Sequence, residues 1–210
     1  MRSLTRDEVD ELDRALIAST EFLYYIDEAR MIDRETFFGG VRLHFGSLNE
    51  TQVQGFEEIL GEWENRELED ERWLAYMLAT CWHETATKMQ PIREMGSEAY
   101  LKRKPYYPWV GEGLVQVTWK RNAVKFGATK PGDLLNWPKA LEALFDGMTK
   151  GMFTGRELGD YFSMRTDDPV HARRIINGMD KAVLIAGYHR NFMGALQPPA
   201  PAALPAKASQ

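Results

Sequence analysis

The chain of 210 residues has very little cysteine and no long apolar run, and both absences restrict what it can be. Cys81 is the only cysteine, so no disulfide can form within the chain, which fits synthesis in a reducing cytoplasm. No stretch approaches the roughly 18 apolar residues of a membrane span, and the first residues lack the apolar run of a signal peptide. We therefore expect a protein that is made in a cytoplasm without a signal peptide, makes no stable membrane insertion, and needs another component to reach an outside target.

The chain also lacks the usual patterns of metal and nucleophile sites. His83-Glu84 could begin a zinc-protease motif, but the position one turn later that needs a second histidine holds Thr87. No Gly-Xaa-Ser-Xaa-Gly elbow occurs, and Cys81 falls on the apolar side of a predicted helix, which indicates a packed thiol. The sequence thus predicts no metal and no cofactor, and it leaves acid–base chemistry by carboxylates.

The net charge of −5 is unevenly distributed along the chain. Residues 1–85 hold 20 acidic and 8 basic residues, whereas residues 88–130 hold 9 basic and 3 acidic ones. The basic segment could attract an anionic polymer, or it could be an ordinary solvated surface that balances an acidic neighbour. Because the whole chain is acidic and has no recognised nucleic-acid motif, we expect no nucleic-acid partner.

Helical signals dominate the pattern, so we expect an α+β fold that is predominantly α. One domain should span residues 1–196, with an N-terminal helical extension over 1–33, followed by a Pro/Ala-rich tail over 197–210. Residues 106–118, rich in proline, glycine and aromatics, predict a small β-hairpin or sheet beside a cleft between helical lobes. The expected helices cover residues 5–27, a segment starting at Asn49, a segment ending near Glu84, and the ranges 120–127, 138–150, 155–162, 169–177 and 180–195.

Glu84 is the leading candidate for a catalytic acid. Trp73, Met77 and Cys81 repeat at helical spacing, and Glu84 follows three positions later on the same face. A carboxyl group beside an apolar wall ionises less readily, so its pKa should rise and it could act as a general acid. The alternative is an ordinary glutamate at a helix end that reaches solvent or caps a loop.

A second carboxylate is needed for acid–base catalysis, and Glu94 is the preferred candidate. It lies ten residues after Glu84, beyond a turn at Pro91, so the chain can bring it back across a cleft. The neighbouring basic segment and open water would keep it ionised. Glu98 and Glu112 are competitors for this role, and each of the three could also be a surface residue.

Four segments in order resemble the signature of glycoside hydrolase family 19, the chitinase-like family, and within it the phage and bacterial endolysin branch. They are His83-Glu84-Thr85, Ile92-Arg-Glu94-Met-Gly96, Gly111-Glu-Gly-Leu-Val-Gln116-Val-Thr118-Trp-Lys-Arg-Asn122, and Arg174-Ile-Ile-Asn177-Gly178. The similarity runs from about residue 34 to residue 195. It implies a lysozyme-like, mainly helical fold with a small sheet and no metal requirement.

The resemblance also implies roles for individual residues. Glu84 would be the proton donor and Glu94 the base that activates water in a reaction that inverts configuration. Two departures from the family pattern are Glu112, which stands where the family usually has arginine between two glycines, and the longer spacing from Tyr107 to that glycine pair. Glu112 therefore remains an alternative base. The expected substrate-binding residues are Tyr107, Gln116, Thr118, Asn122 and Asn177.

The polar and aromatic candidates also have structural alternatives. The amides of Gln116, Asn122 and Asn177 could satisfy backbone groups at the hairpin and at helix ends. Four aromatic residues of the basic segment could pack in the core, but we expect one of them to expose a face that stacks on a sugar ring. These residues are Tyr106, Tyr107, Trp109 and Trp119.

The expected function is that of a peptidoglycan-degrading endolysin, a bacteriolytic muramidase that acts on the cell wall or periplasm after release from the host cytoplasm. Its partner would be the glycan strand of peptidoglycan. One alternative is a chitinase acting on N-acetylglucosamine polymers. Another is a virion-associated structural or wall-binding protein that contacts a virion partner through its C-terminal tail.

Overall fold

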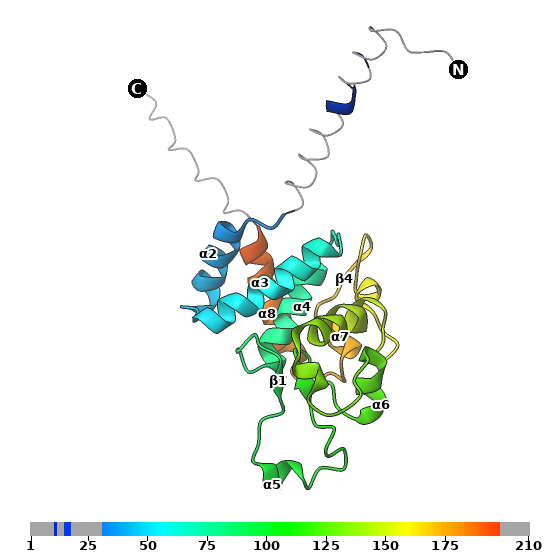
Figure 1. The fold of residues 1–210 in the computed structure, drawn as a ribbon. Helices are drawn as coiled ribbons and strands as arrows, with labels where there is room; N and C mark the ends of the chain where they lie inside the picture. The colour runs from blue at the N-terminus through cyan, green and yellow to red at the C-terminus, as the bar shows by residue number, and fades with distance from the viewer. Residues whose placement is uncertain (1–10, 12–14, 18–30, 198–210) are drawn as a thin grey trace, which may run out of the picture.

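The computed structural model describes residue 11, residues 15–17 and residues 31–197 (Figure 1). Over these residues the chain is mostly helical with two small two-stranded sheets, which confirms the predicted α+β, predominantly α class. The predicted extension over 1–33 and tail over 197–210 lie mainly outside the described residues. Among the helices described, none is both long and apolar enough to cross a membrane.

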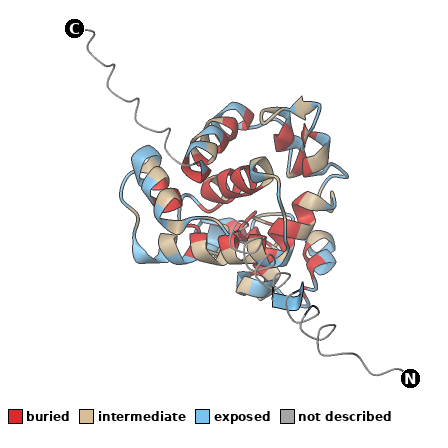
Figure 2. Ribbon diagram, turned by 90° about the horizontal axis from the view of Figure 1, so that it is seen from above, coloured by how far each residue is buried: buried red, intermediate tan, exposed pale blue. Residues whose placement is uncertain are grey.

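Helix α4 (Glu71–Glu84) is the central element. Nine consecutive residues of this helix, from Leu74 to Trp82, are all buried. Its most extensive packing contact is with α8 (Ala182–Leu196). Helices α3 (Glu50–Asn65) and α7 (Trp137–Thr149) also pack against it. Figure 2 shows the buried residues concentrated along the helices in the middle of the molecule. The predicted apolar face is buried at Met77 and Cys81, and the buried surface extends farther round the helix than expected, because a helix covered on all sides is apolar all round.

Helix α2 (Arg34–Phe45) was not among the expected helices. Its Gly39-Gly40 pair lowers helix propensity, although Asp33 caps its start by accepting a hydrogen bond from the Thr36 backbone N–H. A Cβ on Gly40 would lie 2.5 Å from the Cα of Ala195 in α8. The glycine thus allows a close approach of α2 and α8, and tertiary packing stabilises a helix that local propensity disfavours.

Helix α3 begins as the sequence predicts. The Asn49 side chain accepts from the Gln52 backbone, and the Gln52 side chain accepts from the Asn49 backbone, forming a capping box. Farther along α3, a Cβ on Gly55 would lie 1.7 Å from the carbonyl oxygen of Met89. Thr85 at the end of α4 holds the same loop, because its hydroxyl accepts from the Met89 N–H. The loop after α4 is thereby packed onto α3, which fixes where the next strand starts.

The first sheet contains β1 (Ile92–Arg93) and β2 (Glu112–Gly113), which pair antiparallel with Arg93 opposite Glu112. A single bridge joins Glu112 to Val117, so the predicted β element is present but small. Residues 94–111, called the arm from here on, connect the two strands. The arm carries the short helix α5 (Glu98–Leu101) and extends away from the helical body at the bottom of Figure 1.

The second half of the chain agrees with three expected helices and differs at two. The range 120–127 contains α6 (Lys120–Ala123) and the 3₁₀ helix η1 (Val124–Phe126), while α7 and α8 lie close to the predicted 138–150 and 180–195. The predicted helix over 155–162 is wrong, and 169–177 holds only a 3₁₀ helix. Between residues 155 and 177 the chain instead forms η3 (Leu158–Asp160), a hairpin of β3 (Phe162–Ser163) and β4 (Thr166–Asp167), and η4 (His171–Ile175). A further 3₁₀ helix, η2 (Asp133–Leu135), precedes α7.

Short-range chemistry explains these two differences. Gly155 has a φ of 82° and Gly159 interrupts the run, so a regular helix over 155–162 would need two poor helix formers. The range 169–177 is only about two and a half α-helical turns long and ends at Asn177-Gly178, so it can form few α-helical hydrogen bonds and holds a short 3₁₀ helix instead. Helical spacing in a short, glycine-interrupted segment is therefore a weak predictor.

Candidate active site

Five of the seven predicted site residues line one pocket. Its volume is about 350 Å³, and it lies between the end of α4, the turn after β2, the start of α6 and the segment after η4. The structure thus brings together side chains from three of the four segments that carried the family resemblance. The lining residues are Glu84, Val115, Gln116, Val117, Thr118, Trp119, Asn122, Phe153, Ile176 and Asn177.

Glu84 is the last residue of α4 and the only charged side chain among those lining this pocket in the described chain. Its side chain is 16% exposed, and its Oε1 accepts a hydrogen bond from Arg173 Nη1 at 2.7 Å. Arg173 is buried in η4, where its Nε also donates to the carbonyl oxygen of Asp180. The expected apolar wall is therefore incomplete, because a buried guanidinium faces the carboxyl group.

The turn that forms the pocket floor adopts unusual backbone angles. Gln116 has a φ of 52° and Trp119 a φ of 73°, values that residues with a Cβ rarely adopt. Trp119 is 38% exposed, whereas Tyr106, Tyr107 and Trp109 are half-buried, so one of the four aromatic candidates is exposed as expected, although the Arg121 guanidinium lies over one face of its ring. Backbone strain of this kind persists where surrounding contacts enforce it, and it often marks a ligand site.

Side-chain hydrogen bonds hold this turn in place. Gln116 Nε2 donates to the Ile92 carbonyl at 3.0 Å, and Thr118 Oγ1 donates to the Gln116 carbonyl at 3.0 Å. Asn122 Nδ2 donates to the Thr118 carbonyl at 2.9 Å. The structural roles that the sequence left open for these amides are therefore real. Gln116 and Asn122 each use an amide N–H group on the backbone, and both residues line the pocket.

Asn177 forms the opposite part of the pocket lining. Its backbone N–H donates to the Arg173 carbonyl at 3.1 Å, and its Oδ1 accepts from the Gly178 N–H at 2.8 Å. Ile176 and Phe153 lie beside it and give the pocket an apolar portion. The lining thus combines amide, hydroxyl and carboxylate groups with apolar and aromatic surface, a combination suited to a polar ring compound.

Glu94 does not line the pocket but lies close to its rim. Its carboxylate accepts hydrogen bonds from the Tyr106 hydroxyl at 2.9 Å and from the Gly111 N–H at 3.0 Å. The Tyr106 ring contacts Trp119 edge-on, with ring centroids 5.6 Å apart. Burial and the bond to Glu94 raise the pKa of Tyr106, so the phenol remains a donor. Glu94 is therefore held at the base of the arm, one aromatic contact from the pocket.

The two competing acids, Glu112 and Glu98, bind partners outside the pocket. Glu112 is 4% exposed, its Oε1 accepts from the Gly132 N–H at 2.7 Å, and burial raises its pKa. Glu98 lies on α5, where hydrogen bonds from Tyr107 and Arg93 lower its pKa. Neither acid lines the pocket. Tyr107, which was expected to bind substrate, also lies outside the pocket because its hydroxyl binds Glu98.

Sequence reasoning missed Arg173. The resemblance to the family began one position later, at Arg174, and an arginine in a predicted helix is normally assigned to the surface. The one signal in the sequence was that Arg173 lies four residues before Asn177, a predicted site residue. Cys81, by contrast, behaves as predicted, since it is fully buried and burial raises its thiol pKa well above the ordinary range.

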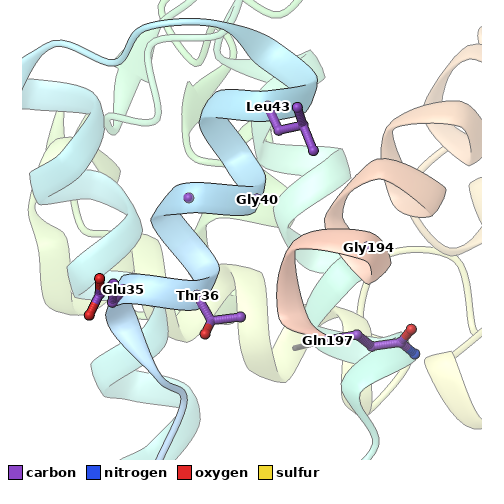
Figure 3. Close-up of a pocket in the computed structure, with 7 residues that line it drawn as sticks. Glu35, Thr36, Gly40, Leu43, Gly194 and Gln197 are labelled. Atoms are coloured by element: carbon purple, nitrogen blue, oxygen red, sulfur yellow. The ribbon is translucent and has the colours of Figure 1, made fainter. Parts of the chain in front are cut away.

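A second pocket, of about 440 Å³, lies between α2 and the end of α8 (Figure 3). Its lining is mostly glycine and apolar surface, and Glu35 is its one ionisable side chain among the described residues. A single carboxylate without a partner acid or base does not make an acid–base site. The labelled lining residues are Glu35, Thr36, Gly40, Leu43, Gly194 and Gln197.

Comparison of the chain with protein-family models, with curated proteins and with solved structures found no match. The class of reaction therefore has to follow from the residues around the pocket. Over the described residues, no group of three or more His, Cys, Asp or Glu side chains gathers as metal ligands would. What the pocket does offer is a carboxylate in its wall, a second carboxylate near its rim, and amide and aromatic groups between them.

Proposed function

We propose that this chain is a glycoside hydrolase with a lysozyme-like, two-lobed fold that cleaves β-1,4 linkages between amino sugars. The observation that carries the proposal is the position of Glu84, a largely buried carboxyl group in the wall of a polar pocket that the exposed Trp119 also lines. Amide groups can bind the hydroxyl and acetamido groups of a sugar, and an indole face can stack on its ring.

The proposed reaction inverts configuration. Glu84 donates a proton to the glycosidic oxygen as the bond from that oxygen to the anomeric carbon breaks. A water molecule attacks the anomeric carbon from the opposite face, and Glu94 accepts the proton that this water loses. Inverting enzymes hold the two carboxyl groups roughly 6.5–9.5 Å apart, so that a water molecule fits between base and sugar.

Arg173 fits this scheme as a positioning residue. Its guanidinium holds the Glu84 carboxyl group at one orientation and stabilises the negative charge that Glu84 carries after donating its proton. The Tyr106 hydroxyl and the Gly111 N–H orient Glu94 in a comparable way.

Within this class, we propose a peptidoglycan-degrading endolysin that cuts between N-acetylmuramic acid and N-acetylglucosamine. Support comes from the ordered resemblance to the endolysin branch of family 19, and from the fact that Glu84, Gln116, Thr118, Asn122 and Asn177 from its segments meet at one pocket. A chitinase on N-acetylglucosamine polymers would use the same residues. A wall-binding protein without catalysis is the other alternative, and an acid at position 112 does not disturb the pocket as such a protein would allow, because Glu112 is buried against the Gly132 backbone.

The test is to measure the release of reducing ends from purified peptidoglycan sacculi and from chito-oligosaccharides. Glu84→Gln should lower turnover by about a hundredfold or more, because general acid catalysis contributes about 10²–10⁴. Glu142→Gln, the same change on an exposed acid of α7, is the matched control and should be fully active. Near-normal activity of Glu84→Gln would refute the assignment. Cleavage of the oligosaccharides but not of sacculi would replace the endolysin by a chitinase.

A further inference from the structure

The arm and the start of α6 form a basic surface. The acidic side chains near it already have hydrogen-bond or ion-pair partners. Residues 88–130 contain nine basic and three acidic residues. Glu94 accepts hydrogen bonds from Tyr106 and the Gly111 backbone, Glu98 binds Arg93 and Tyr107, and Glu112 is buried on the Gly132 backbone. These acids therefore neutralise little of the outward charge. The cations of this surface, called the basic face, are the exposed Lys102, Arg103, Lys120 and Arg121 and the half-buried Lys104.

Three of these cations lie over aromatic rings. The Lys104 ammonium is 4.3 Å from the centre of the Tyr100 ring, and the Arg121 guanidinium carbon is 5.3 Å from that of Trp119. Lys120 lies 5.9 Å from the Trp109 ring centre. Such stacking restrains long side chains that would otherwise be disordered in solvent, so less entropy is lost when they bind an anion.

This surface continues into the candidate active site. Trp119, which lies under Arg121, also lines the pocket, and its ring contacts Tyr106, the residue that binds Glu94. The backbone joins the same parts, because the Trp119 N–H donates to the Trp109 carbonyl at 3.0 Å. A polymer that leaves the pocket past Trp119 would therefore meet alternating aromatic rings and cations.

The opposite end of the molecule has the opposite charge. Helix α3 carries Glu50, Glu57, Glu58, Glu62 and Glu64, of which Glu57 and Glu64 share Arg34 and Glu62 pairs with Arg66, so Glu50 and Glu58 supply most of the outward negative charge; Figure 1 shows α3 far from α5. An anionic polymer would be repelled by the α3 side and attracted by the arm. The charge separation thus favours approach of such a polymer toward the side of the molecule that carries the pocket.

We propose that the basic face is an extended binding site for a carboxylate-bearing glycan, with the sugar chain in the pocket and its carboxylates on the arm cations. The inference rests on the proposed function and deepens it, because it assigns the enzyme to acidic amino-sugar polymers rather than to neutral ones. The free carboxylates of the stem peptides on a wall polymer fit this surface. Free chitin, which carries no carboxylate, does not use it.

The experiment measures binding without hydrolysis. The Glu84→Gln variant is co-sedimented with sacculi before and after their carboxyl groups are converted to neutral amides with a carbodiimide and an amine. In the same background, Lys102→Glu/Arg103→Glu reverses two exposed arm cations whose side chains make no hydrogen bond in the described structure. Arg165→Glu/Arg190→Glu makes the same change of charge on exposed residues outside the arm.

The arm variant should bind native sacculi about tenfold more weakly at low salt, and the difference should shrink at about 0.5 M salt through screening. Amidated sacculi should bind both proteins equally weakly. The proposal is overturned if the arm variant binds native sacculi normally, or if the control variant loses as much affinity. It is also overturned if the arm change weakens binding only to anionic phospholipid vesicles, which would identify a membrane surface.

Failure of the proposed function gives a different result. If the native protein released no reducing ends from either form of sacculus or from chito-oligosaccharides, the hydrolase would be refuted, while the co-sedimentation would still decide whether the arm binds carboxylates. Conversely, a native protein that hydrolysed amidated and native sacculi at equal rates at low substrate concentration would remain a hydrolase but would have no acidic-glycan preference.

Discussion

Arg173 and Glu84 are separated by 89 residues in the chain, yet their side chains meet at 2.7 Å where η4 packs beside the end of α4. Arg173 is buried and Glu84 is 16% exposed, so the pair is shielded from water on most sides. Because Glu84 lines the pocket and Arg173 is part of the packed core, the position of the Glu84 carboxyl group depends on how η4 packs against α4. Both stability and activity should therefore respond to changes in either residue.

A double-mutant cycle should reveal this coupling. Arg173→Met leaves the Glu84 carboxylate without its partner, so the free energy of unfolding should fall by about 3 kcal/mol. Arg173→Met combined with Glu84→Gln removes both charges and should lose about 1–3 kcal/mol less than the sum of the single changes. Urea unfolding at neutral pH measures all four proteins. Strict additivity would show that the contact contributes nothing to stability.

The identity of the base can be decided by comparing two neighbouring glutamates. Glu94→Gln should lower the rate of sacculus hydrolysis by about a hundredfold or more. Glu112→Gln should keep near-normal activity, because Glu112 lies outside the pocket and a glutamine oxygen can still accept from Gly132. Since burial raises the pKa of Glu112, removing its charge should also leave stability at neutral pH unchanged or improved. The reverse pattern of activities would move the base to Glu112.

The buried His189 should make stability depend on pH. Burial lowers its pKa from 6.5 to about 4, and the ring stacks on Phe162 beside Tyr76. Because the folded pKa lies below the unfolded one, the unfolded chain binds the proton first as the pH falls. Stability present above pH 6.5 is therefore lost as the pH falls toward about 4, by about 3 kcal/mol in total.

The measurement is the free energy of unfolding between pH 7.5 and pH 4 for the native protein and for His189→Gln. The native minus variant difference should shrink or reverse as the pH falls, because the variant has no imidazole to protonate. His171→Gln, on an exposed histidine paired with Asp168, serves as the control. A pH-independent difference for His189→Gln would mean that the buried ring does not titrate in this range.

Two glycines of α3 should respond oppositely to alanine. A Cβ on Gly55 would lie 1.7 Å from the Met89 carbonyl oxygen, so Gly55→Ala should displace the loop after α4 and cost about 3 kcal/mol. No atom lies within 4 Å of a Cβ built on Gly61, and alanine there should stabilise the helix by about 0.5–1 kcal/mol. Thermal unfolding tests both. Equal effects would contradict the packing of that loop on α3.

Local signals predicted part of this structure well. The Asn49–Gln52 capping box, the end of a helix near Glu84, and the helices α7 and α8 follow from caps, periodicity and breakers that act within a few residues. Local signals failed where distant packing decides, as at α2, whose glycine pair is tolerated because Gly40 meets Ala195. They also failed at 155–162, where glycines leave a 3₁₀ turn and a hairpin.

The same division applies to the candidate site. The sequence by itself predicted five residues that line the pocket, because the residue types and their order along the chain resemble a family signature; they are Glu84, Gln116, Thr118, Asn122 and Asn177. Only the tertiary structure decided that Arg173 faces Glu84, that Tyr106 holds Glu94, and that Glu112 and Tyr107 lie outside the pocket. The physical reason is that burial and partner choice depend on which distant segments pack together, and residue type alone does not carry that information.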